Sequence, residues 1–223
     1  GVQCSGTGQV TSISLTNNGL AGDLPAGIGG MANLIELDLS DNALTGSLPS
    51  TWLAVQDPSS EPFIHDNEVE STLFPELEVL NLRGNSLAQS AYAAVQTVIT
   101  WPMLQTLDLS DNSLSGTLDG VFTVEYCTDG GATCAATQVV GGGIRLNVLL
   151  LRGNGISGSL PATSFPERLA VLDLADNTFT GSVPEAYSSL KMLYLTGNSG
   201  LASGSLPSFM ELSTTEYDSV IDL

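Results

Sequence analysis

The chain has 223 residues, of which 42% are hydrophobic, and its 24 acidic and 5 basic residues give a formal net charge of −19. That apolar content is ample for a folded core, whereas the charge repels phosphates and excludes nucleic acid as a partner. No apolar run reaches transmembrane length, so we expect no membrane segment within these residues.

A repeated pattern runs through almost the whole chain. Written as L-x-x-L-x-L-x-x-N-x-L-x-G-x-L-P, it is clearest between Leu34 and Pro49. Seven copies are in register, and their asparagines are Asn18, Asn42, Asn85, Asn112, Asn154, Asn177 and Asn198. A fixed period of this kind is the signature of a solenoid, in which stacked units share one core because no unit can bury its apolar face alone.

Each L-x-L segment alternates between the two faces of a strand. In the clearest copy, Leu37 and Leu39 point inward and Asp38 points outward. The asparagine follows the strand, where the chain turns and backbone groups lose their partners in the sheet. Because an asparagine side chain both donates and accepts hydrogen bonds, we predict that the seven asparagines form a structural ladder between coils.

This pattern resembles the leucine-rich repeat, and its L-x-G-x-L-P ending resembles the plant-specific class that includes receptor-kinase ectodomains and polygalacturonase-inhibiting proteins. The resemblance implies an α/β-type right-handed solenoid. Its curved parallel sheet of about eight strands would form the concave face, with short 3-10 or α segments on the convex face. It covers nearly all of residues 1–223, so we expect a single domain. It implies less about function, because the repeat is a scaffold.

Both ends of the chain fit positions inside a larger protein of this class. The opening Gly1-Val2-Gln3-Cys4 resembles the end of an N-terminal cap, and the resemblance implies that Cys4 pairs with an upstream cysteine. At the other end, residues 220–223 match the register of an eighth strand, with Asp222 aligned to Asp38. We therefore expect the chain to be a fragment of a longer one.

An acidic insertion interrupts the second copy over residues 55–72. The distance from Leu34 to Leu77 is 43 positions, compared with 24 from Val10 to Leu34. The insertion contains Asp57, Glu61, His65, Asp66, Glu68 and Glu70. A solvated loop is the favoured interpretation. A weak Ca²⁺ site is the alternative, although the spacing is not that of an EF-hand, so we predict no metal site.

A short helix is expected in the third copy, which loses its G-x-L-P ending. Residues 88–99 read AQSAYAAVQTVI, and Tyr92, Val95 and Ile99 fall on one helical face. We predict that this face packs against the convex side of the solenoid. Trp101-Pro102 then ends the helix.

A second insertion, over residues 123–143, contains Cys127 and Cys134. Two cysteines close together in one loop indicate a local disulfide, since a zinc site needs four ligands and no second pair exists. A disulfide indicates an oxidising compartment, so we expect an extracellular or cell-surface location.

The outward strand positions form the candidate binding face. We predict that ligand contacts come from Asp38, Asn81, Arg83, Asp108, Leu150, Arg152, Asp173 and Tyr194. Arginine and tyrosine are enriched at binding hot spots, and Arg83 and Arg152 are two of only five basic residues. The alternative is that both arginines only form salt bridges with Asp108 and Asp173.

The sequence favours a non-catalytic recognition module, the extracellular part of a receptor or adhesion protein that binds a protein, peptide or carbohydrate through its concave face. A secreted inhibitor of a wall-degrading enzyme, or a passive structural surface protein, remains an alternative. No phosphate loop, nucleophile elbow or zinc motif is present, so we expect neither an enzyme nor a cofactor.

Overall fold

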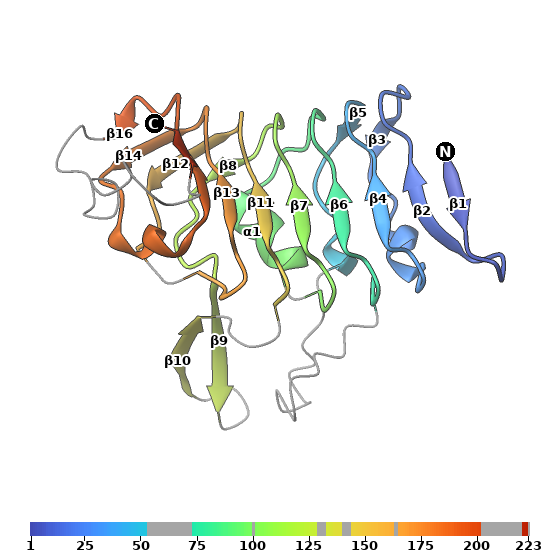
Figure 1. The fold of residues 1–223 in the computed structure, drawn as a ribbon, viewed down its shortest axis with the longest axis horizontal. Coiled ribbons are helices and arrows are strands. Elements are labelled where there is room, and N and C mark those ends of the chain that lie inside the picture. The colour runs from blue at the N-terminus through green and yellow to red at the C-terminus, as the bar shows by residue number, and fades with distance from the viewer. Residues whose placement is uncertain are drawn as a thin grey trace.

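The computed structural model describes residues 1–52, 73–99, 101–128, 133–139, 144–162, 165–201 and 220–222, and only the backbone for 123–139 and 220–222. Figure 1 shows a solenoid in which short strands stand side by side along the longest axis. The acidic insertion predicted at 55–72 lies outside the described residues.

One sheet of nine strands forms the concave face, in the order β1-β2-β4-β6-β7-β11-β13-β15-β17. Neighbouring strands are parallel, except that β1 pairs antiparallel with β2. The predicted curved solenoid with about eight parallel strands is therefore confirmed. The strands are β1 (Val2–Cys4), β2 (Val10–Ser14), β4 (Glu36–Asp38), β6 (Val79–Asn81), β7 (Thr106–Asp108), β11 (Val148–Leu150), β13 (Val171–Asp173), β15 (Met192–Tyr194) and β17 (Val220–Asp222).

The middle residue of each parallel strand points into the core. Leu37 pairs in register with Leu80, which pairs with Leu107, and the row continues through Leu149 and Leu172. These five side chains are at most 1% exposed. Burying one leucine stabilises a fold by about 1.5–3 kcal/mol, so the row holds successive coils together.

A second set of strands, which the sequence did not predict, lies beside the main sheet. One group has the order β16-β14-β12-β8, and β3 pairs with β5. The L-x-G-x-L segments of the repeats form these strands, with Gly158 inside β12 at φ 88°. The bounds are β3 (Ala21–Asp23), β5 (Ala43–Thr45), β8 (Ser115–Gly116), β12 (Gly155–Ser159), β14 (Thr178–Gly181) and β16 (Gly200–Leu201).

Short helices cover the convex side, as predicted. The 3-10 helices are η1 (Ala26–Gly30), η2 (Ser50–Trp52) and η3 (Glu185–Ser189). Each follows a proline whose carbonyl oxygen accepts the first hydrogen bond of the turn. The helix α1 spans Ala91–Val98 and lies behind the main sheet in Figure 1.

The predicted face of α1 is correct at Val95 and Ile99, which are 0% and 1% exposed, but wrong at Tyr92, which is 41% exposed. The helix instead buries the spacing i, i+3, i+4, i+7 that runs from Ala91 to Val98. Alanine lets the helix approach the core closely, whereas a tyrosine in that position would hold it away.

The cysteine-containing insertion forms an antiparallel hairpin of β9 (Thr123–Thr128) and β10 (Thr133–Val139). Its register places the Cα of Cys127 directly opposite that of Cys134. The side chains of this hairpin lie outside the described residues, so the disulfide stays a prediction.

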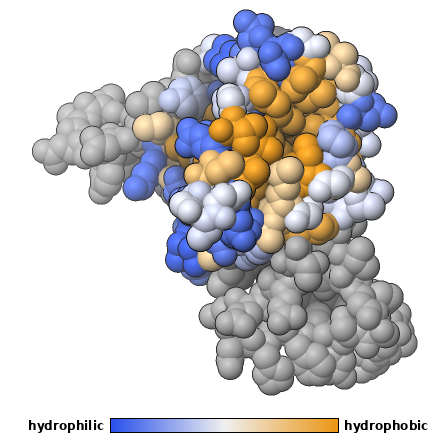
Figure 2. Space-filling model, turned by 90° about the vertical axis from the view of Figure 1, so that its right-hand side faces the viewer, coloured by the Kyte–Doolittle hydropathy of each residue, from blue (hydrophilic) through white to orange (hydrophobic). Residues whose placement is uncertain are grey.

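The N-terminal end of the solenoid presents apolar surface, which Figure 2 shows end-on. Val10, Ile13, Leu15 and Leu20 are only partly buried, because they pack against the core on one side. β1 pairs with the outer edge of β2, so the backbone of β2 is not left as an open sheet edge.

Candidate functional site

The main sheet brings six of the eight predicted ligand-binding residues into one row. Neighbouring strands place them directly opposite one another, in the order Asp38, Asn81, Asp108, Leu150, Asp173 and Tyr194. Arg83 and Arg152 follow Asn81 and Leu150 by two residues, just beyond the ends of their strands. All eight positions therefore belong to one face.

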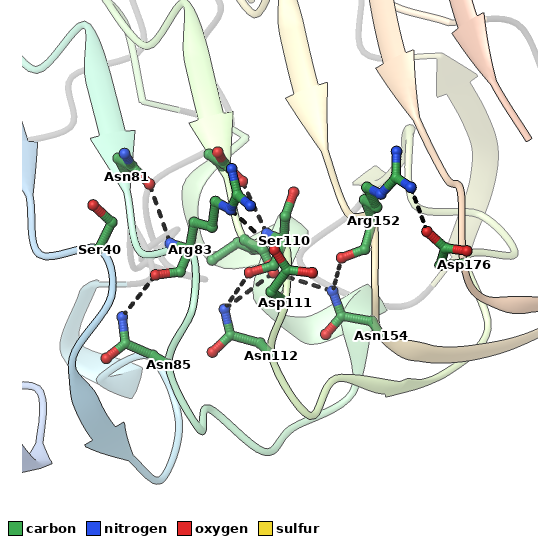
Figure 3. Close-up of polar contacts among 12 residues, drawn as sticks. Ser40, Asn81, Arg83, Asn85, Ser110, Asp111, Asn112, Arg152, Asn154 and Asp176 are labelled. Atoms are coloured by element: carbon green, nitrogen blue, oxygen red, sulfur yellow. Dashed lines mark hydrogen bonds and ion pairs between the residues drawn. The ribbon is translucent and has the colours of Figure 1, made fainter. Parts of the chain in front are cut away.

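Both arginines form ion pairs with aspartates of the next coil (Figure 3). Arg83 Nε donates to Asp111 Oδ2 at 2.9 Å, and Arg152 Nη2 lies 2.6 Å from Asp176 Oδ2. The predicted partners Asp108 and Asp173 were wrong by three residues. The sequence signal for the true partners is the Asp-Asn dipeptide that places an aspartate before the ladder asparagine. Because the four side chains are 44–56% exposed, each pair contributes only about 0–1 kcal/mol.

The glycine after each arginine is required by the coil beneath it. Gly153 has φ 65°, a region that residues with a Cβ rarely adopt. A Cβ on Gly153 would collide with Asp111 Oδ1 of the preceding coil. The Arg-Gly-Asn tripeptide thus combines an outward-facing arginine, a tight turn and a ladder asparagine in consecutive positions.

The aspartates of the row hold the turns that follow their strands. Asp38 Oδ1 accepts from the Ser40 backbone N–H at 3.0 Å, and Asp108 Oδ1 accepts from Ser110 N–H at 2.9 Å. Asn81 Oδ1 does the same for Arg83 N–H at 3.1 Å. A side chain that accepts from the N–H two residues later stabilises a turn, so these residues order the surface whether or not they contact a ligand.

Asp173 differs because it lies in a less solvated part of the row. Burial raises the pKa of its carboxyl above the ordinary value, with nearby Asp108 and Asp176 adding to the effect. The backbone N–H of Ala175 and the guanidinium of Arg152 act in the opposite direction. Because the folded protein binds this proton more tightly than the unfolded chain does, ionisation of Asp173 destabilises the fold.

We expect the free energy of unfolding of the natural chain, relative to Asp173→Asn, to rise as the pH falls through the raised folded-state pKa. The gain is complete below the unfolded-state pKa and is lost again as the pH rises. Urea unfolding of both proteins across this pH interval measures the difference in their free energies of unfolding. The other carboxyl groups are the same in both proteins, so their contributions cancel in that difference. A difference that is constant, or that falls with decreasing pH, would contradict the prediction.

Apolar side chains are concentrated on the C-terminal half of the face, where they surround the partly exposed Asp173. Val148, Leu150 and Val171 are partly exposed on β11 and β13, and Met192 on β15 is 36% exposed. Tyr194 lies beside Met192, with its hydroxyl 3.8 Å from the Met192 Sδ. We call Val148, Leu150, Val171, Met192 and Tyr194 the apolar stripe. Leu150 and Tyr194 were predicted as ligand contacts, whereas the two valines were not, although their outward position follows from the strand alternation.

The N-terminal half of the same face is polar, with Ser12, Ser14, Glu36 and Asp38 at the corresponding positions.

No group of three or more His, Cys, Asp or Glu side chains able to hold a metal ion occurs in the described part of the chain. Within those same residues, no helix is long and apolar enough to cross a bilayer. The face thus offers charge-paired arginines at one end of the strands and an apolar stripe along three of them, an arrangement suited to binding.

A family model described as Leucine Rich Repeat matches residues 33–54, 103–123 and 168–190. Receptor-like protein 35 of Arabidopsis thaliana is 28% identical over 179 residues, which are 77% of this chain and 16% of that protein. The chain therefore spans less than a fifth of the length of this curated relative.

Two solved structures share the fold. The crystal structure of a Pollen Receptor Kinase 3 is 25% identical, with a TM-score of 0.63, over 92% of this chain and 82% of that one. The plant peptide hormone receptor RGFR1 in complex with RGF2 is 26% identical, with a TM-score of 0.58, over 83% of this chain and 24% of that one. The repeats, the parallel sheet and these likenesses agree, and the chain is a leucine-rich repeat solenoid similar to the ectodomains of plant receptor-like proteins and receptor kinases.

Proposed function

We propose that this chain is the extracellular recognition part of a receptor-like protein and that it binds a peptide through the apolar stripe and Arg152. It acts by binding alone and needs no cofactor. The observation that carries the proposal is the apolar stripe itself, which gathers partly exposed aliphatic and aromatic side chains on three adjacent strands around Asp173.

The chemistry of the stripe fits a peptide. Three adjacent parallel strands present Val148, Leu150, Val171, Met192 and Tyr194 as one rigid surface, because each is held in register by its neighbours. Methionine and tyrosine adapt to and anchor apolar side chains of a partner. Arg152, at the end of β11, adds a guanidinium that can bind a carboxylate by exchanging its exposed pair with Asp176. One of the similar structures is a peptide hormone receptor with its peptide, which supports the same class of ligand here.

Selection of random-sequence peptides on the immobilised chain, followed by affinity measurement on variants, tests the proposal. We expect Tyr194→Ala to raise the Kd of a selected peptide by about tenfold or more, because truncating a hot-spot aromatic commonly costs above 1 kcal/mol. Arg152→Gln should raise it as well.

The matched control is Tyr92→Ala, which removes the same side chain from the exposed side of α1, on the opposite side of the solenoid from the sheet face. Selected peptides whose affinity falls equally with Tyr92→Ala and Tyr194→Ala, or with neither, would show that the apolar stripe is not the binding surface.

A further inference from the structure

The three basic residues outside the arginine pairs gather in one groove. Arg145, Arg168 and Lys191 line a hollow of about 530 Å³ together with Asn147, Gln105 and Glu167. The groove lies at the amino ends of β7, β11, β13 and β15, which is the lower edge of the sheet in Figure 1. In a chain with 24 acidic and 5 basic residues, three of the five cations therefore share one site.

The strand register fixes how these cations are spaced. Arg145 and Arg168 each lie three residues before the paired residues Val148 and Val171, so they occupy the same position in adjacent coils. Lys191 lies one coil further on, directly before Met192, which pairs with Val171. With parallel strands about 4.8 Å apart, the positive charges extend over about 10 Å along the edge.

These like charges have no ion-pair partner in the part of the chain that the structure describes. Among the described residues, no carboxylate lies within ion-pair distance of Arg145, Arg168 or Lys191, although Glu167 lines the same groove. At the equivalent positions of the β6 coil the edge carries Glu76 and Glu78, so the charge changes sign along the edge. Adjacent like charges repel one another, and all three cations are exposed, so an anion from solution can reach them and would relieve this repulsion.

We propose that this groove is a second binding site, which takes an acidic peptide segment through two or three neighbouring carboxylates. Guanidinium groups bind carboxylates through paired, charge-assisted hydrogen bonds, and the 10 Å spread of charge matches about three residues of an extended peptide. The site shares no residue with the apolar stripe, so this proposal can be tested independently of the proposed function.

The neutral groups of the groove favour a peptide over an acidic sugar. Asn147 Nδ2 donates to the Arg168 carbonyl oxygen at 2.8 Å, which leaves Asn147 Oδ1 as an acceptor with no partner among the described residues. Gln105 adds a second amide. Each residue of a peptide offers a backbone N–H donor and a C=O acceptor, which can hydrogen-bond with the side-chain amides of Asn147 and Gln105. The described lining contains no aromatic side chain on which a sugar ring could stack.

Binding of fluorescently labelled hexaglutamate, with hexaglutamine as its neutral match, tests the proposal. The titration is best run at physiological salt, where repulsion from the distant acidic surface is screened beyond about 8 Å. We expect hexaglutamate to bind and hexaglutamine not to bind. Arg168→Gln should raise the Kd for hexaglutamate at least about tenfold, which is the effect of losing one charge-assisted hydrogen bond. Glu167→Gln should strengthen the binding, because it removes the negative charge from the groove.

The matched control is Gln9→Glu, which changes the net charge by the same amount at an exposed site near the N-terminus. If Gln9→Glu weakens binding as much as Arg168→Gln does, or if hexaglutamate does not bind, the groove is not an anion site. Tighter binding of an oligogalacturonate than of hexaglutamate would overturn the assignment to a peptide. Tyr194→Ala should leave the affinity for hexaglutamate unchanged, which separates this result from a failure of the apolar stripe.

Discussion

Asn177→Ala is expected to lower the free energy of unfolding by about 2–3 kcal/mol. The Asn177 side chain is 5% exposed and bridges two coils. Its Oδ1 accepts from the Ile156 N–H at 3.1 Å, and its Nδ2 lies 3.0 Å from the carbonyl oxygens of Leu151, Leu174 and Ala175. Alanine leaves the Ile156 N–H buried without a partner, which costs about 1–3 kcal/mol. It also removes one donor from each of the three carbonyls, which keep a second donor: the Asn154 and Asn198 side chains and the Gly153 N–H.

Asn18→Ala is the matched control, because it makes the same change at the same repeat position. Asn18 is exposed, and none of its side-chain atoms makes a hydrogen bond within the described residues, since it belongs to the first coil. We expect a change within about 0.5 kcal/mol. Urea unfolding monitored by circular dichroism measures both variants. Equal losses for Asn18→Ala and Asn177→Ala would show that the ladder does not hold the coils together.

Trp101→Ala is expected to destabilise the fold by about 3–5 kcal/mol, the range for truncating a fully buried aromatic. Trp101 is 1% exposed, and its ring centroid lies 4.5 Å from that of Phe74 and 6.0 Å from that of Trp52. Its Nε1 donates to the Trp52 carbonyl oxygen at 3.2 Å. Trp52 and Phe74 flank the insertion on either side, so this cluster closes the coil where the repeat period is interrupted.

Trp101→Phe is the milder change at this position. It keeps an aromatic ring in the cluster but removes the Nε1 donor and part of the ring volume, so we expect a smaller loss, about 1–2 kcal/mol. Tyr92→Ala, on the exposed side of α1, should cost less than about 1 kcal/mol. The same thermal or urea measurement ranks the three variants. A ranking in which Trp101→Ala is no worse than Trp101→Phe would contradict the role given to this cluster.

The repeat pattern was sufficient to predict the main sheet. Ile13, Leu37 and Leu80 occupy the same position in successive copies, and the structure pairs them in register. Stacking of near-identical units leaves one arrangement that buries every leucine, so the periodicity alone determines which residue faces the core. The same logic explains why the strand over residues 220–222 could be predicted from the register of residues 220–223 alone.

The repeat pattern predicted the role of most of the ladder asparagines but not of all. Their position after each strand indicated hydrogen bonds between coils, and Asn85, Asn112 and Asn154 make them to the backbone of both their own coil and the preceding one. The sequence could not separate Asn18 from the others, because the letter pattern is the same. Only the stack shows that Asn18 has no earlier described coil to bridge.

The sequence by itself determined the solenoid, the rows of inward leucines and the face on which Arg83, Arg152 and Tyr194 lie, because each follows from a fixed local period. Tertiary structure decided what the period leaves open: the pairing of Arg83 with Asp111, the second row of strands and the exposure of Tyr92. It also brought Arg145, Arg168 and Lys191 into one groove. These features depend on the distance and angle between coils, which are set when whole units pack against one another.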